Sequence, residues 1–266
     1  MPPFFCFIYL KKSYLKWKVG VFNLKKAVKS FILFLLIIMA AISGFSFFSE
    51  KYNDYKEDKD YKTIEQKYYK KNNTKEKNDK RKENSKSSNL DIKGIRKENK
   101  NVVGWLYCKG VVSYPLVQGD DNIYYLSHNA LNQSNVSGAI FLDYRMKNKF
   151  KENNCIIYGH NMKNKYMFGS LLDYVNYSFA ETHNIFYIDN GVSKQKYKLF
   201  SVRLTHDGGN DYSINLTNEE FQNWFNEMKN TSYYKDTNIS INKTITLSTC
   251  YSNDASIKLV LHLVRI

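Results

Sequence analysis

Two side chains that could do chemistry together, a cysteine and a histidine, each follow a run typical of a β-strand. Cys250 closes the run KTITLST at residues 243–249, whose β-branched residues alternate, and a polar loop at 251–256 comes next. His160 lies two residues after a short apolar run at 155–158. A thiol becomes a nucleophile beside a histidine, and strand ends hold such groups rigidly. The pattern indicates a nucleophile and its base; the alternative is that Cys250 is a small buried apolar side chain.

The other cysteines and histidines suit structural positions. Cys108 and Cys155 lie in apolar runs and are predicted core residues, and Cys6 lies near the N-terminus. No CxxC pair and no zinc-like Cys/His spacing occurs, so the sequence predicts neither a disulfide framework nor a metal site. Three of the remaining histidines are expected on the surface: His128, His183 and His206. The fourth, His262, lies within the final strand and is expected to be structural.

The formal net charge of +15 is concentrated in the N-terminal part of the chain. Residues 1–30 carry seven lysines and no acidic residue, and residues 50–100 carry 17 Lys/Arg against 11 Asp/Glu. Residues 101–266 are almost balanced, with 16 against 14. A basic excess beside an apolar stretch indicates a membrane-proximal segment and argues against nucleic-acid binding.

That apolar stretch, residues 31–48, holds no charged residue and is long enough to span a bilayer. A cleaved signal peptide is the competing interpretation. However, the run is longer than the apolar core of a usual signal peptide, and the small residues that could form a cleavage site lie inside the run. An uncleaved transmembrane anchor is therefore expected. Lysines before it place the N-terminus, residues 1–30, in the cytoplasm and the bulk of the chain outside.

Residues 49–88 are rich in Lys, Glu, Asp and Asn and contain few aliphatic residues. Such a segment cannot bury a core, which predicts a charged extracellular stalk that is at most partly helical. Composition changes at residue 89, where a short capped helix is expected to begin the catalytic domain, 89–266. Residues 1–88 are accordingly predicted to be dispensable for chemistry.

The domain reads as mainly β. Two helices are also expected, from the apolar spacing at 167–175 and at 221–228, the second after a capping box of Thr217 and Glu220. Many short strands with few helices favour a closed or nearly closed barrel. Eight strand-like runs occur, at residues 102–108, 111–117, 138–142, 155–158, 184–189, 194–205, 243–249 and 257–264.

Several motifs in order resemble class B sortases. TLSTC at 246–250 resembles the sortase nucleophile strand, and YGHNM at 158–162 with MFG at 167–169 resembles the class B histidine segment. The likeness extends through NVVGWL, YPLVQG, DNIYYL and GAIFLDY at 101–106, 114–119, 121–126 and 138–144, and covers about residues 89–266. It implies an eight-stranded sortase barrel with a few peripheral helices, outside a Gram-positive membrane.

The resemblance also implies a reaction, cysteine transpeptidation without metal or organic cofactor. The thiolate would attack the threonine carbonyl of a sorting motif near the C-terminus of a secreted protein. An amine of a cell-wall peptide would then resolve the acyl-enzyme. In these roles Cys250 is the nucleophile and His160 the general acid/base; the substrate groove is implied to include Asn122, Leu126, Tyr158, Ser248 and Thr249.

One position departs from the family. Sortases have an arginine on the strand after the nucleophile, and here that position holds Lys258. Strand alternation puts Arg265 on the opposite face of the strand from Lys258. It also lies roughly 20 Å further along the strand, so it is a poor substitute. The cationic role is therefore assigned to Lys258, the alternative being a solvated lysine beside an impaired site.

Two rival functions stay open on the sequence. A cysteine hydrolase would use the same residues, with water as the acceptor, because acceptor choice depends on groove shape. A tethered binding module with the same fold is the second, and the intact His160 and Cys250 argue against it. A pilin-polymerising sortase is disfavoured by the class B-like motifs and by the lack of a second apolar run at the C-terminus.

Overall fold

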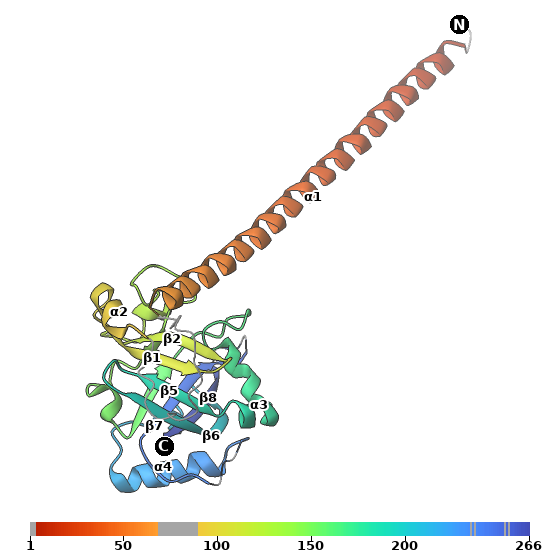
Figure 1. Ribbon diagram of the computed structural model, residues 1–266. Helices are drawn as coiled ribbons and strands as arrows, with labels where there is room; N and C mark the ends of the chain where they lie inside the picture. The colour runs from red at the N-terminus through yellow and green to blue at the C-terminus, as the bar shows by residue number, and fades with distance from the viewer. Residues whose placement is uncertain (1–3, 69–89, 235, 237, 253, 255) are drawn as a thin grey trace. The chain divides into compact units, whose positions relative to one another are not determined.

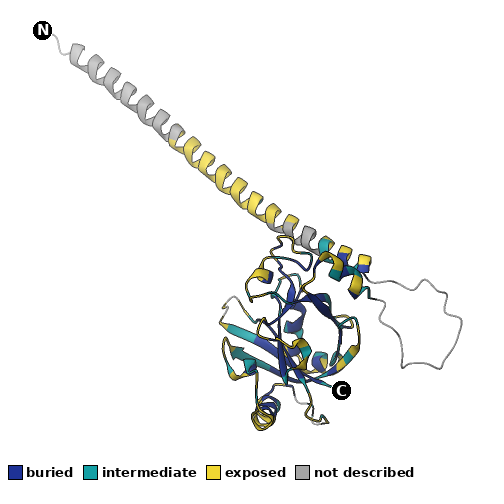
Figure 2. Cartoon of the chain, turned by 90° about the vertical axis from the view of Figure 1, so that its left-hand side faces the viewer, coloured by how far each residue is buried: buried dark blue, intermediate teal, exposed yellow. Residues whose placement is uncertain are grey.

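The computed structural model describes residues 4–68, 90–234, 236, 238–252, 254 and 256–266. The chain divides into two compact units, Met1–Lys56 and Glu57–Ile266. The helix α1, Phe4–Tyr68, contributes residues to both. Within the described residues, Val28–Ser49 is the stretch long and apolar enough to cross a membrane, and it includes the predicted span at 31–48. Its large apolar side chains are exposed (Figure 2).

The second unit is a closed β-barrel (Figure 1), as the sequence predicted. Strands neighbour one another in the order β1-β2-β3-β4-β7-β8-β6-β5. The β2–β3 and β4–β7 pairs are parallel and the other neighbours are antiparallel. The strands are β1 Val102–Cys108, β2 Val112–Val117, β3 Ile140–Leu142, β4 Asn154–Tyr158, β5 Ile185–Asp189, β6 Lys194–His206, β7 Thr244–Cys250 and β8 Ile257–Arg265.

Helices and 3-10 turns fill the connections. The short helix expected near residue 89 is α2, capped by the Asp91 carboxylate, which accepts from the Gly94 N–H. The α-helices of the barrel unit are α2 Ile92–Glu98, α3 Tyr177–Thr182 and α4 Asn218–Asn230. The 3-10 helices are η1 Tyr124–Leu126, η2 Lys149–Lys151, η3 Gly169–Val175 and η4 Asn210–Tyr212.

The two helices predicted from apolar spacing differ in outcome. Helix α4 forms with its capping box, and its apolar stripe packs against Phe200 and Val264 on the outer side of the barrel. The segment at 167–175 instead forms the 3-10 helix η3, which starts only at Gly169. Met167 has a φ of 51°, which an α-helix cannot accommodate, and Val175 at the other end is exposed.

The core of the barrel unit is a set of buried apolar residues contributed by its strands and η3 (Figure 2). A second cluster lies on the outer side of β1 and joins Trp105 to α2 and to the last turns of α1. There the structure differs from the expected solvated stalk at 49–88, because Ile64 and Tyr68 are buried in this cluster. The compact unit that contains the barrel begins at Glu57. Residues 69–88 of the predicted stalk lie outside the described residues.

Candidate active site

The thiol of Cys250 lies at the end of β7, directly opposite Lys258 on β8. The two residues are cross-strand partners in the antiparallel β7–β8 register, with the 251–256 loop between the strands. The Lys258 Nζ donates to the Cys250 Sγ at 3.4 Å. Asp207, just beyond the end of β6, places a carboxylate oxygen 3.4 Å from the same ammonium. A cation held against the sulfur stabilises a thiolate and any negative charge that develops beside it.

The strand pairing brings His160 to the same edge of the barrel. β4 and β7 run parallel, with Tyr158 opposite Ser248, so both strands end side by side. His160 and Cys250 line one cavity of about 410 Å³. The His160 Nε2 lies 2.8 Å from the Leu126 carbonyl oxygen. Because a carbonyl only accepts, Nε2 carries a proton there, and Nδ1 is the nitrogen that can exchange a proton with a reacting group.

Asn122 and Tyr158, two of the predicted groove residues, are held by one buried carboxylate. The fully buried Asp143 accepts from the Asn122 Nδ2 at 3.1 Å and from the Tyr158 hydroxyl at 3.0 Å. Arg145 donates to both oxygens of the same carboxylate at 2.9 and 2.8 Å. Burial alone would raise the pKa of Asp143, but the hydrogen bonds from Arg145 and Tyr158 outweigh it and lower the pKa.

The other predicted groove residues also line the cavity, and they differ in exposure and hydrogen bonding. The Leu126 side chain is 41% exposed, which leaves an apolar surface for a ligand. The Ser248 hydroxyl lies 2.7 Å from the Tyr212 hydroxyl, and either can donate. The Thr249 hydroxyl is buried without a hydrogen-bond partner. The structure therefore brings together every candidate site residue named from the sequence.

Behind the site, His262 has the structural position expected from its strand. Its Nε2 lies 3.0 Å from the Asp211 carboxylate, and its Nδ1 lies 3.0 Å from the Thr246 hydroxyl. Arg203 donates to the same oxygen of Asp211 at 2.8 Å. This buried network holds η4, whose last residue, Tyr212, contacts the Ser248 hydroxyl.

The other two cysteines of the barrel unit, Cys108 and Cys155, have surroundings that keep a thiol unreactive. Cys108 and Cys155 are buried, as predicted, and burial raises the pKa of the Cys108 thiol to about 11 and that of Cys155 to about 12. Cys250 is half-buried. Among the described residues, no group of three or more His, Cys, Asp or Glu side chains could hold a metal ion.

Sequence reasoning missed four residues that shape this site: Asp143, Arg145, Asp207 and Tyr212. The signal for Asp143 was available, because it closes the strand-like run GAIFLDY and a carboxylate next to an apolar strand needs a partner. Asp207 and Tyr212 carry no such signal. Both lie in the connection after β6, which is distant from Cys250 in sequence; Asp207 lines the cavity, and Tyr212 contacts Ser248.

Comparisons with known proteins identify the class of this barrel. A family model described as the Sortase domain matches residues 109–264. The chain is 33% identical over 167 residues to sortase B of Listeria monocytogenes and 32% identical over 163 residues to sortase B of Staphylococcus aureus. Each match covers 60% of this chain and 67% of the relative.

Solved structures agree. Sortase B from B. anthracis, in complex with AAEK1, superposes with a TM-score of 0.68 at 28% identity, covering 80% of this chain and 98% of that one. A sortase B–substrate complex from Staphylococcus aureus gives a TM-score of 0.61 at 30% identity, covering 66% and 84%. The chain belongs to the sortase family, and it is a sortase-type cysteine transpeptidase whose relatives are sortase B enzymes.

Proposed function

We propose that this chain cleaves a sorting motif near the C-terminus of secreted proteins, after a threonine, and transfers the protein to an amine of a cell-wall peptide. One observation carries the proposal most directly. The Cys250 sulfur and the Lys258 ammonium lie 3.4 Å apart at the edge of the cavity that His160 also lines. A nucleophile, a cation and a proton carrier at one cavity are the groups that acyl transfer requires.

In the acylation step Cys250 gives its proton to the His160 Nδ1, and the thiolate attacks the threonine carbonyl carbon to form a tetrahedral oxyanion. Lys258 stabilises that charge from the neighbouring strand. The C–N bond of the motif then breaks, and His160 gives a proton to the departing amine through Nδ1, since its Nε2 is engaged by the Leu126 carbonyl. The products are a thioester on Cys250 and a free C-terminal peptide.

In the second step the acceptor amine attacks the thioester carbonyl. His160 accepts the proton that the amine loses, and the Cys250 thiolate leaves as the new amide bond forms. Water in place of the amine would give a carboxylic acid and a hydrolase. A transpeptidase and a hydrolase therefore differ in the nucleophile that reaches the thioester, and their products can be distinguished.

The cavity is suited to an extended peptide. Leu126 offers an exposed apolar side chain, while Asn122, Tyr158 and Ser248 line the cavity with polar groups. The solved sortase B–substrate complex of Staphylococcus aureus supports the expectation that this fold binds a substrate.

The N-terminal part of α1 is proposed to anchor the enzyme in the cell membrane. Val28–Ser49 is long and apolar enough to span a bilayer, and lysines precede it. By the positive-inside rule, the N-terminus is then cytoplasmic and the barrel extracellular, where secreted proteins and wall peptides are found.

The test uses the full chain in detergent with a peptide library in which one threonine is constant. We expect cleavage after threonine, a covalent thioester detected by mass spectrometry, and a hydroxamate product when hydroxylamine is added as the amine. Cys250→Ala should form no thioester, and His160→Ala should lower turnover by roughly two to four orders of magnitude. His206→Ala, at an exposed histidine, is the matched control. A full rate in Cys250→Ala, or acid as the sole product with hydroxylamine present, would contradict the proposal.

A further inference from the structure

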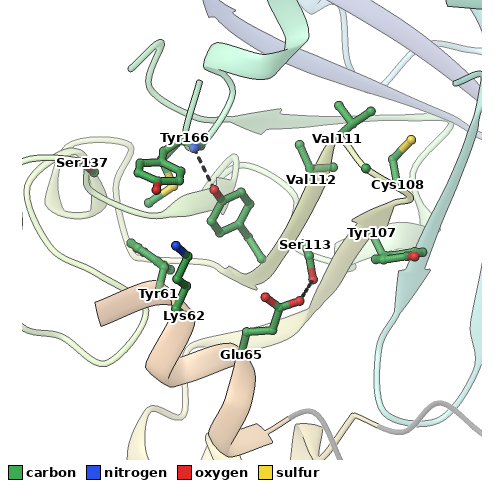
Figure 3. Close-up of a pocket in the computed structure, with 13 residues that line it drawn as sticks. Tyr61, Lys62, Glu65, Tyr107, Cys108, Val111, Val112, Ser113, Ser137 and Tyr166 are labelled. Carbon is green, nitrogen blue, oxygen red and sulfur yellow. Dashed lines mark hydrogen bonds between the residues drawn. The ribbon is translucent and has the colours of Figure 1, made fainter. Parts of the chain in front are cut away.

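The last turns of α1, residues 61–68, pack directly on the barrel. Ile64 and Tyr68 are buried there, and the Ser113 hydroxyl on β2 donates to the Glu65 carboxylate at 2.7 Å. Tyr61 is partly buried and packs against both large apolar clusters of the unit. A cavity of about 310 Å³ separates this helix end from the β1–β2 hairpin, and Figure 3 shows Tyr61, Lys62 and Glu65 pointing into it from α1.

Tyr61 contacts the backbone next to the Leu126 carbonyl, which is the hydrogen-bond acceptor of the His160 ring. Its hydroxyl donates to the Gly138 carbonyl. Gly138 has a φ of +58°, and a Cβ there would lie 2.4 Å from the Tyr125 carbonyl oxygen and 2.8 Å from that of Leu126, so these backbones are in close contact. The Leu126 carbonyl is the group that accepts from the His160 Nε2 at 2.8 Å. The backbone that orients the His160 ring is thus braced by the Tyr61 hydroxyl.

A second contact leads to the backbone around His160. The Tyr61 ring packs edge-to-face on the Tyr114 ring, with centroids 5.4 Å apart and an interplanar angle of 84°. The Tyr114 hydroxyl accepts from the Met167 N–H at 3.1 Å. Met167 forms an isolated β-bridge with Asn161, the residue after His160.

The Met167 backbone needs such support. Its φ of 51° is in the left-handed region, which is uncommon for a residue other than glycine and persists when neighbouring contacts hold it. The following residue, Phe168, donates its N–H to the His160 carbonyl at 2.9 Å. Tyr114 therefore stabilises the turn at 160–168 that carries the histidine, and Tyr61 supports Tyr114 from the outside.

We propose that Tyr61 is a positioning residue for His160, through which the end of the anchor helix holds the histidine in its working orientation. Two independent sets of contacts connect Tyr61 to His160. One runs through Gly138 and Leu126, and the other runs through Tyr114 and Met167. Proton transfer depends on geometry within fractions of an ångström, so a loosened His160 slows the chemical step more than it weakens peptide binding. The kinetic consequence rests on the proposed function; the placement of His160 does not.

Hydrogen exchange of the full chain in detergent tests the placement without any substrate. In Tyr61→Ala, backbone amides of residues 159–168 and 135–139 should exchange roughly fivefold faster or more, because both supports are lost. Tyr61→Phe keeps the ring contact with Tyr114, so it should affect residues 135–139 and leave 159–168 closer to the parent. Gln66→Ala, exposed on the same helix end, should match the parent. Unchanged exchange at 159–168 in Tyr61→Ala would overturn the proposal.

A double-mutant cycle tests whether Tyr61 acts through His160, using the library peptide that the parent chain cleaves fastest. Tyr61→Ala should lower kcat by roughly tenfold with KM within about twofold, and in a His160→Ala background it should change the residual rate by less than about twofold. An equal loss in both backgrounds would show a general structural role and overturn the coupling. If the parent cleaves no library peptide, the proposed function fails, and the exchange measurement still decides the placement of His160.

Discussion

Cys250 and Lys258 face each other across the antiparallel strands β7 and β8, and the ammonium of Lys258 donates to the thiol sulfur at 3.4 Å. The two residues are in contact because the loop at 251–256 joins β7 to β8 and places them directly opposite each other. In the proposed acyl-transfer step the oxyanion forms next to the Cys250 sulfur, which is why Lys258 is the group proposed to stabilise it. Arg265 lies at the far end of β8, opposite Tyr197.

Replacing Lys258 should therefore impair acylation. Removal of one group that stabilises an oxyanion typically costs two to three orders of magnitude, so we expect Lys258→Ala to lower the rate of thioester formation by roughly that factor. Lys258→Arg should retain or raise activity, because the guanidinium keeps the charge and adds a planar pair of donors. Thioester formation followed by mass spectrometry measures both. A parental rate in Lys258→Ala combined with a loss in the control Arg265→Ala would refute this assignment.

Asp143 should control peptide binding without touching the thiol. Its carboxylate holds the side chains of Asn122 and Tyr158, and a buried charged hydrogen bond is costly to break. Asp143→Asn should raise the KM for peptide by roughly tenfold and leave kcat nearly unchanged. Steady-state kinetics gives both constants, with Glu181→Gln on the exposed side of α3 as a control for loss of one acidic residue. A fall in kcat alone would assign Asp143 a different role.

Asp211 should make the barrel sensitive to acid. Burial alone would raise its pKa, but the hydrogen bond from His262 and the charge of Arg203 outweigh burial and lower the pKa to about 2. A group with a depressed pKa in the folded state stabilises the protein above its unfolded pKa of about 3.9, and loses this contribution as the pH falls toward 2.

Urea unfolding between pH 5 and pH 2 measures that contribution, which should reach about 2 kcal/mol. Asp211→Asn should flatten this part of the pH profile, and it should also lower the free energy of unfolding at pH 7, because Arg203 and His262 lose their buried partner. An unaltered slope between pH 4 and pH 2 in the variant would show that other carboxylates dominate the acid response.

The end of α1 should contribute to the stability of the barrel. Ile64 is 3% exposed in the cluster around Trp105, so Ile64→Ala should lower the free energy of unfolding by about 3 kcal/mol. Gln66→Ala should change it by less than about 0.5 kcal/mol. A truncated chain of residues 89–266 should be less stable than one of residues 57–266. Equal unfolding midpoints for the two truncated chains would contradict this expectation. The prediction that residues 1–88 are dispensable for chemistry is a separate one, which the proposed role of Tyr61 would limit.

Cys250 should be the thiol of the barrel that alkylates quickly. At pH 8 the Cys108 and Cys155 thiols, with pKa values raised to about 11 and about 12 by burial, are almost entirely protonated. Iodoacetamide should therefore modify Cys250 at least roughly a hundredfold faster than either of them. Peptide mapping by mass spectrometry separates these sites from Cys6. Rapid modification of Cys108 or Cys155 in folded protein would show that the barrel opens more readily than its packing suggests.

The sequence by itself determined the strands, the order of the motifs and the residues with catalytic chemistry. Alternating β-branched residues and turn residues are local signals, so the positions of β7 and β8 and the capping box of α4 could be read directly. The same holds for Cys250 and His160, since a strand followed by a polar loop marks where such groups can be presented. The many short strands favoured a barrel, and the resemblance to class B sortases implied its eight-stranded sortase type; the structure and the comparisons confirm both.

Only the tertiary structure decided which groups support those residues. The Leu126 carbonyl beside His160, Asp207 beside Lys258 and Asp143 under Asn122 depend on barrel closure, which brings together segments distant in sequence. The end of α1 is the clearest case, because its charged composition predicts a solvated stalk. Ile64 and Tyr68 are nevertheless buried, since two apolar side chains on one helical face are enough to pack when an apolar patch around Trp105 is there to receive them.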